Sequence, residues 1–344
     1  MRVAILGASG YTGLELLRIV LRHPRLEPVV VTSEQRAGQP VKEAFPQLQR
    51  LAELRFEALD PEKIVGRVDA AFSCLHAGTA ARAVAVLRKA GLPVVDLSAD
   101  FRFSDPAIYA AWYGDHQAPE WFGQAVYGIP ELHGAELRGA SFVAGAGCHA
   151  TAALLPLAPF LRADLVGPGP VIVDSKTGVS GAGRTLEDRY LFAELDENVQ
   201  AYQVAAHRHA PEIEQEASLA AGRPVAVTLV PQLLPVIRGI AASVYLRPSA
   251  PLTTEDAQAL LAEAYRDEPF VRVLPPGQPP SLAAVRGSNF CDVSAFVDER
   301  HGTLIALSTL DNLGKGASGQ MVQCLNVMMG FDEREGLLEA PLVP

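Results

Sequence analysis

Long apolar runs are missing from this sequence, in which no stretch reaches the roughly 18 consecutive apolar residues that a membrane-spanning helix needs. The N-terminal apolar run, residues 3–6, stops at Gly7 and is too short for the apolar region of a secretory leader. We therefore expect a cytoplasmic protein that has no membrane partner.

An excess of basic residues is also missing, because 29 Lys and Arg stand against 39 Asp and Glu and give a formal net charge of −10. Nucleic acids are bound through net basic surfaces, so this balance argues against a nucleic-acid partner. Apolar residues make up 49% of the chain and charged residues 20%, which is typical of a globular protein. A chain of 344 residues is long enough for two domains of about 100–200 residues each.

Cysteine is scarce and dispersed, at Cys74, Cys148, Cys291 and Cys324. These residues form no C-x-x-C pair, and no Cys/His cluster has the spacing of a metal site. We therefore expect a reduced protein, built neither on disulfides nor on a bound metal.

The N-terminal residues have the pattern of a dinucleotide-binding unit. A short apolar run at residues 3–6 leads into Gly7-Ala8-Ser9-Gly10-Tyr11-Thr12-Gly13, and helical spacing of apolar residues follows as far as His23. Glycine permits a tight turn and a close backbone approach, and the helix N-terminus then faces a pyrophosphate. The order strand, glycine turn, helix predicts the start of a Rossmann-like βαβ unit.

The end of the second apolar run, residues 28–31, indicates which dinucleotide is used. Ser33 and Arg36 suit the 2′-phosphate of NADP, whereas Glu34 would suit the ribose of NAD, and we favour NADP. Later strands alternate with helices, so we expect a parallel sheet whose strand ends, Ser73 among them, border the cofactor. The predicted cofactor-binding residues of this half are Gly7, Ser9, Gly10, Tyr11, Thr12, Gly13, Ser33, Arg36 and Ser73.

The rest of the chain differs in composition and in the spacing of its apolar residues. Residues 105–136 are rich in aromatics, proline and glycine, and they predict an irregular insertion. Beyond residue 170, apolar runs follow one another with few helical patterns between them, which favours a mostly antiparallel sheet. Thr253 to Asp256 predict a capping box that starts a helix, and a final helix at residues 317–329 is expected to return to the first domain.

Cys148 is the candidate nucleophile. It follows the glycine-rich turn of residues 143–147 and precedes the alanine- and leucine-rich run 151–161, which predicts a helix. A helix N-terminus favours the thiolate, which is the reactive form of cysteine. The alternative is an inert buried thiol that behaves as a small apolar side chain.

Three polar clusters in the second half could serve a nucleophile: residues 175–184, residues 207–209 and residues 231–239. The first is a glycine-rich loop with hydroxyls and cations, which suits an anionic substrate. The second is His207-Arg208-His209, which is either a surface feature or the source of the base that a thiol nucleophile needs.

Taken in order, these motifs resemble the N-acetyl-γ-glutamyl-phosphate reductases of the semialdehyde dehydrogenase superfamily. The resemblance runs from the Gly7–Gly13 turn through residues 94–102, 127–132, Gly147-Cys148, 177–183, Tyr202 and 207–209 to Arg238-Gly239 and 311–316. It implies a Rossmann-like NADP-binding domain at residues 1–147, an α+β substrate and dimerisation domain at 148–311, and a C-terminal helix at 312–344 that packs on the first domain.

The resemblance also implies an activity, the reductive dephosphorylation of an acyl phosphate by NADPH through a thioester on Cys148. His209 would be the acid/base with His207 nearby, and which of the two fills the role stays open. Ser180, Gly181 and Arg238 would lie around the substrate, and Asn312 near the nicotinamide. The expected partners are a small-molecule acyl phosphate and further copies of the chain in a homo-oligomer.

The residues around Cys148 depart from the family pattern. The family usually has Asn-Pro-Gly-Cys-Tyr-Pro-Thr, whereas this chain has Gly145-Ala146-Gly147-Cys148-His149-Ala150-Thr151. The Ala-Gly-Ala-Gly-Cys turn is similar to enzymes of lysine biosynthesis that reduce an aminoadipyl phosphate attached to a carrier protein. Residues 186–192 are closer to the arginine-pathway pattern, so we favour N-acetyl-γ-glutamyl phosphate. A dinucleotide-binding redox sensor and a relative without catalytic activity are further alternatives.

Overall fold

The computed structural model describes residues 1–51 and 53–342, which form two compact units. The first unit combines Met1–Ala146 with Ala317–Leu338. The second combines Gly147–Gly316 with the described residues from Glu339 onward. Within the described ranges, no helix has both the length and the apolar character that crossing a membrane requires.

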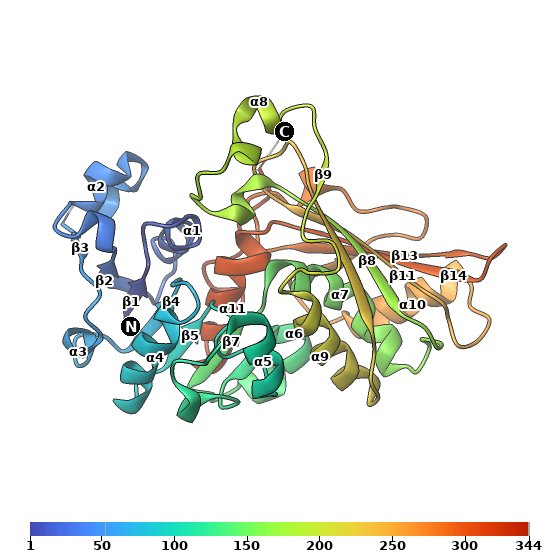
Figure 1. Ribbon diagram of the computed structural model, residues 1–344, viewed down its shortest axis with the longest axis horizontal. Coiled ribbons are helices and arrows are strands. Elements are labelled where there is room, and N and C mark those ends of the chain that lie inside the picture. The colour runs from blue at the N-terminus through green and yellow to red at the C-terminus, as the bar shows by residue number, and fades with distance from the viewer. Residues whose placement is uncertain (52, 343–344) are drawn as a thin grey trace. The chain divides into compact units, whose positions relative to one another are not determined.

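The first unit is built on a parallel sheet of seven strands in the order β3-β2-β1-β4-β5-β7-β6 (Figure 1). Its central strands read as unbroken apolar runs because helices cover both faces of a parallel sheet, and Val3, Ala4 and Ile5 are fully buried. The predicted Rossmann-like sheet is confirmed. The strands are β1 (Arg2–Leu6), β2 (Glu27–Thr32), β3 (Phe56–Glu57), β4 (Ala70–Ser73), β5 (Val94–Asp96), β6 (Val126–Gly128) and β7 (Phe142–Gly145).

The helices of the first unit include two, α5 and α6, in or beside the segment that the sequence predicted to be irregular. That prediction was wrong for residues 105–136, which contain α5, β6 and most of α6, and β6 pairs with β7 at the sheet edge. Asp105 caps α5 by accepting a hydrogen bond from Ala107 N, and Pro106 opens that helix, so the start signal was present. The helices are α1 (Tyr11–Val20), α2 (Val41–Ala44), α3 (Pro61–Ile64), α4 (Thr79–Lys89), α5 (Pro106–Tyr113), α6 (Pro130–Leu137) and α11 (Gly319–Met328).

The C-terminal helix α11 belongs to the first unit, as the sequence predicted. Ser318 Oγ donates to the carbonyl of Thr12 at 2.7 Å, at the N-terminal end of α1. Gln323 Nε2 donates to Glu131 Oε1 at 3.0 Å, and Asn326 Oδ1 lies 2.9 Å from His23 Nε2. These buried polar contacts connect α11 to the glycine turn, to α6 and to the end of α1.

The second unit contains a seven-stranded mixed sheet in the order β12-β13-β14-β11-β8-β10-β9 (Figure 1). It is mostly antiparallel, as expected, but β8 pairs with β10 and β12 with β13 in parallel. The strands are β8 (Val171–Thr177), β9 (Gln200–Ala201), β10 (Val227–Leu233), β11 (Ile240–Leu246), β12 (Val271–Val273), β13 (Cys291–Asp298) and β14 (Thr303–Leu310). The helices are α7 (Cys148–Arg162), α8 (Phe192–Leu195), α9 (Ala210–Ala221) and α10 (Thr254–Ala264), the last with the predicted capping box at Thr253.

Helix α7 is the centre of the second unit, because every residue from 149 to 161 is buried. A helix that is apolar on all sides must be enclosed, and α7 packs against β11, β14, α9 and α10. Pro156 and Pro159 lie inside it and remove the N–H groups that would bond the carbonyls of the residues four positions earlier. Those carbonyls accept hydrogen bonds from side chains instead: Ser308 Oγ donates to Ala152 O, and Tyr265 OH donates to Leu155 O.

Candidate active site

Cys148 is the first residue of α7, three residues earlier than the predicted start of the helix. The N-cap is Gly147, which has no side chain that could cap the helix, and the positive end of the helix dipole stabilises an anion such as a thiolate. Cys148 is partly exposed, whereas Cys291 and Cys324 are fully buried. Burial raises the pKa of the Cys74 thiol to about 12, which makes that thiol unreactive. Cys148 is therefore the cysteine suited to nucleophilic chemistry.

His209 packs directly on the turn before the nucleophile. A Cβ atom built on Gly147 would lie 2.6 Å from both Cε1 and Nε2 of the His209 ring. The backbone of Gly147 is extended, with φ −68° and ψ 145°, so its conformation alone does not require glycine. Glycine is needed at this position because the imidazole occupies the place of a side chain.

The Gly147→Ala variant tests this contact. We expect the added methyl group to displace the His209 ring by an ångström or more and to lower kcat/KM about 100-fold, while the melting temperature changes little. Steady-state kinetics with a thermal melt measure both effects. Gly134→Ala is the matched control, since a Cβ at Gly134 meets nothing within 4 Å. Activity near that of the wild type in Gly147→Ala would contradict the proposed closeness of His209.

Glu212 also contacts the turn before Cys148, through a hydrogen bond to its backbone. This residue was not among those predicted from the sequence. Its Oε1 accepts a hydrogen bond from Gly147 N at 2.7 Å, and its side chain is fully buried. His209 is the N-cap of α9 and Glu212 lies in the first turn of that helix, so one helix end supplies both contacts. The sequence holds no local signal for this contact, because Glu212 and Gly147 are 65 positions apart.

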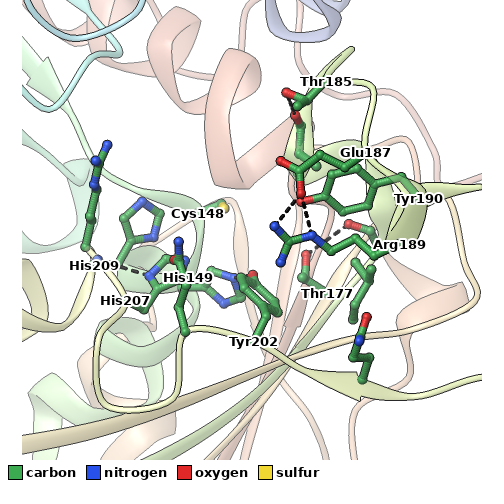
Figure 2. Close-up of a pocket in the computed structure, with 17 residues that line it drawn as sticks. Cys148, His149, Thr177, Thr185, Glu187, Arg189, Tyr190, Tyr202, His207 and His209 are labelled. Atoms are coloured by element: carbon green, nitrogen blue, oxygen red, sulfur yellow. Dashed lines mark hydrogen bonds and ion pairs between the residues drawn. The ribbon is translucent and has the colours of Figure 1, made fainter. Parts of the chain in front are cut away.

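Three imidazole rings lie together beside Cys148, as Figure 2 shows. The ring centroid of His207 is 4.8 Å from that of His209 and 5.1 Å from that of His149. Burial, with a smaller effect of Arg208, lowers the pKa of His207 to about 4. Burial and His207 lower the pKa of His149 to about 3. His149 and His207 are therefore neutral near pH 7.

These residues border a cavity of about 460 Å³. Cys148, the histidines and Tyr202 lie on one side of it, and Glu187, Arg189 and Tyr190 lie on the other (Figure 2). The guanidinium of Arg189 pairs with the carboxylate of Glu187. A cavity that joins a thiol, imidazoles and guanidinium groups suits an anionic electrophile. The lining residues are Cys148, His149, Thr177, Gly178, Gly181, Ala182, Thr185, Glu187, Arg189, Tyr190, Gln200, Tyr202, Gln203, His207, Arg208, His209 and Leu233.

Of the predicted substrate-binding residues, Gly181 lines the cavity, whereas Ser180 and Arg238 are not among its lining residues. Arg238 Nη2 is 2.9 Å from Asp311 Oδ1, a fully buried carboxylate that also accepts from Gly287 N. Asn312 is buried in the second unit, where its Nδ2 donates to Ser180 Oγ at 2.9 Å and its Oδ1 accepts from Gly239 N at 2.6 Å. The structure thus brings Ser180, Arg238 and Asn312 into one network, and a contact of Asn312 with nicotinamide stays a prediction.

The glycine turn of the first unit fits a dinucleotide. Gly7 has φ +74° and a Cβ there would lie 2.8 Å from Cys74 O, while a Cβ on Gly13 would lie 2.5 Å from Ala8 Cα. Gly10 has neither restriction, because its φ is −72° and a Cβ would meet only Gly7 O at 3.6 Å. A bound pyrophosphate that approaches the N-terminus of α1 accounts for glycine at this position.

The remaining cofactor candidates lie around the ends of β1, β2 and β4. Ser9 Oγ lies 2.7 Å from Ser33 Oγ, so the turn and the end of β2 are joined. Tyr11 and Thr12 begin α1. Ser73 is fully buried, hydroxyl included, so its side chain is not on the surface that a bound molecule meets.

Glu34, the acidic residue that would suit the ribose of NAD, already has a hydrogen-bond partner within the protein. Glu34 Oε1 accepts a hydrogen bond from Leu59 N at 2.6 Å. Arg36 Nη1 donates to Gln39 Oε1 at 3.0 Å, and the guanidinium lies 5.5 Å from the centre of the Phe45 ring. Arg36 lies just after the end of β2, and its guanidinium has further N–H donors for a phosphate. These contacts of Glu34 and Arg36 favour NADP over NAD.

Comparison with known proteins agrees with this arrangement. Residues 2–140 match the family described as semialdehyde dehydrogenase, NAD binding domain, and residues 148–312 match semialdehyde dehydrogenase, dimerisation domain. The chain is 47% identical to N-acetyl-gamma-glutamyl-phosphate reductase of Citrifermentans bemidjiense and 46% identical to that of Geobacter metallireducens, with 100% of both chains covered in each comparison.

Solved structures show the same fold at low sequence identity. Aspartate semialdehyde dehydrogenase II of Vibrio cholerae superposes with a TM-score of 0.71 at 18% identity, covering 96% of this chain and 98% of the other. The Candida albicans aspartate semialdehyde dehydrogenase, solved with NADP, gives a TM-score of 0.71 at 18% identity, covering 95% and 98%.

Proposed function

The chain belongs to the semialdehyde dehydrogenase family, among the N-acetyl-γ-glutamyl-phosphate reductases, and we propose that it reduces N-acetyl-γ-glutamyl phosphate to N-acetylglutamate semialdehyde in arginine biosynthesis. NADPH supplies the hydride when it is bound. The observation that carries the proposal is the arrangement of Cys148 at the N-terminus of α7 with His209 packed on Gly147. The relatives that favour this substrate are matched over their full length.

The chain's own residues support a mechanism in two stages. The Cys148 thiolate attacks the acyl carbon, a C–S bond forms, and the C–O bond to phosphate breaks with its electron pair leaving on inorganic phosphate. His209 takes the thiol proton, and cations at the cavity, Arg189 and Arg208, offset the charge of the substrate phosphate. The thioester then accepts a hydride, and the C–S bond breaks to give the aldehyde and the thiolate. Backbone N–H groups of the first turn of α7 are placed to stabilise the oxyanion.

The reverse reaction tests the function. Purified protein is incubated with N-acetylglutamate semialdehyde, inorganic phosphate and NADP, and the absorbance of reduced nicotinamide is followed. We expect phosphate-dependent reduction of NADP, and we expect none with a carrier-bound aminoadipate semialdehyde. Absence of turnover with the acetylated substrate would reject the proposal, and turnover with only the carrier-bound aldehyde would assign the chain to the lysine-type reaction.

We also propose an oligomeric state and a cellular location for the protein. The matched dimerisation domain and the partly exposed face of β8, where Ile172 is 44% exposed, support a homo-oligomer. The dispersed cysteines support a cytoplasmic location. Light scattering on the purified protein measures the first property.

Arg36 is proposed to recognise the 2′-phosphate of NADP. We expect Arg36→Ala to lower the preference for NADP over NAD by about 10-fold or more, because a charge-assisted hydrogen bond is lost. The kcat/KM values for both cofactors in the reverse assay measure this preference. Arg55→Ala is the control, since its guanidinium donates to the carbonyl of Gly38. An unchanged preference in Arg36→Ala would remove Arg36 from the cofactor site.

A further inference from the structure

His149, the residue after the nucleophile, connects two hydroxyl groups. Its Nδ1 lies 2.7 Å from Ser175 Oγ on β8, and its Nε2 lies 3.0 Å from the hydroxyl of Tyr202. The imidazole is 3% exposed and, as described above, neutral, so it carries a single N–H.

The surroundings of Ser175 determine which nitrogen carries that hydrogen. Ser175 is fully buried, and in the part of the chain that the structure describes its hydroxyl has no hydrogen-bond partner other than His149 Nδ1. A buried hydroxyl hydrogen needs an acceptor, so Ser175 donates to Nδ1. The ring hydrogen is therefore on Nε2, and His149 donates it to the oxygen of Tyr202.

This assignment fixes the role of the Tyr202 hydroxyl. Its oxygen already accepts from His149, so its own hydrogen points elsewhere, and Tyr202 lines the cavity together with Cys148. Burial first, and then the charge of the Cys148 thiolate, raise the pKa of Tyr202, so the hydroxyl keeps its hydrogen near pH 7. Cys148 and Tyr202 border the same cavity, so a group bound covalently to the sulfur can come within reach of the hydroxyl (Figure 2).

We propose that Tyr202 is a catalytic residue that donates a hydrogen bond to the oxygen of the acyl group carried by Cys148, and that His149 is a positioning residue that directs this hydrogen into the cavity. The inference rests on the proposed function, because it assigns a donor to the thioester of that reaction. The bond strengthens as the acyl oxygen becomes negative when the carbon turns tetrahedral, so it acts mainly on kcat.

Kinetics of the reverse reaction test the proposal. Tyr202→Phe is expected to lower kcat about 100-fold while KM for the aldehyde stays close to that of the wild type. His149→Asn keeps an acceptor near the place of Nδ1 but loses the donor to Tyr202, so its kcat is also expected to fall. His149→Gln places an amide near Nε2 and is expected to retain most of the activity.

Combining the variants separates positioning from a structural role. If His149 acts through Tyr202, the double variant Tyr202→Phe/His149→Asn is expected to be no slower than Tyr202→Phe alone. Tyr245→Phe and His301→Asn, both outside the cavity, are controls, and thermal melts check that each variant is folded.

Three results would overturn the inference: full kcat in Tyr202→Phe, a rise in KM alone, or additive losses in the double variant. These results are distinct from failure of the proposed function, in which the wild-type protein itself shows no phosphate-dependent turnover.

Discussion

Replacing Cys148 by serine is expected to lower kcat by about four orders of magnitude or more, because the variant loses the atom that forms the covalent intermediate. The N-terminus of α7 stabilises a thiolate through the helix dipole, but it cannot ionise an alcohol near pH 7. The measurement is the initial rate of NADP reduction with the semialdehyde and phosphate. Mass spectrometry of the protein quenched with the acyl phosphate in the absence of NADPH is expected to show an acyl adduct on the wild type and none on Cys148→Ser.

Cys74→Ser is the matched control for this substitution. The Cys74 thiol is buried and its pKa is raised to about 12, so we expect the control to retain its rate and its acyl adduct. A Cys148→Ser rate within about 100-fold of the wild type would show that the reaction does not pass through a thioester on this residue. Loss of activity in both variants to the same degree would point instead to a general effect on stability.

Replacing His209 by asparagine is expected to lower kcat about 1000-fold, which is the usual range for removing a general acid/base. His209 packs on Gly147, one residue from the nucleophile, and it begins the helix that also carries Glu212. His207→Asn is the comparison and is expected to lose less than about 10-fold, since asparagine keeps an acceptor near the place of His207 Nδ1, which accepts from His209 N at 3.1 Å.

The pH dependence distinguishes the two histidines independently. The pKa of His207 is about 4, lowered by burial, so His207 stays neutral across the range in which the assay is run. If His207 were the base, kcat/KM would rise with pH through a pKa near 4 and be level above it. A profile of that form, together with a small effect of His209→Asn, would transfer the acid/base role to His207.

Features that are encoded by neighbouring residues could be predicted from the sequence. A strand, three glycines and an amphipathic helix occupy adjacent residues, so the parallel sheet and the glycine turn could be predicted from short segments. The position of Cys148 at a helix N-terminus followed from the glycines before it and the alanines after it. Only the first residue of the helix was misplaced, because alanine-rich sequences do not mark their own start.

Contacts between residues far apart in the sequence could not be predicted from local patterns. Glu212 reaches Gly147 across 65 positions, and His149 reaches Ser175 across 26, and neither contact has a local pattern. The short elements in residues 105–136 were missed for another reason, since α5 and α6 are only 8 residues long and carry little amphipathic signal.

The two prolines of α7 also make particular pairs of positions depend on each other. Proline at 156 leaves the carbonyl of Ala152 to Ser308, and proline at 159 leaves that of Leu155 to Tyr265. A residue other than proline at 156 would add a backbone N–H that competes with the hydroxyl of Ser308 for the carbonyl of Ala152. Positions 156 and 308, and likewise 159 and 265, are therefore expected to vary together among related sequences. Each pair also fixes the position of α7 along the helix axis. The same contacts therefore set the axial position of the Cys148 sulfur in the first turn of that helix.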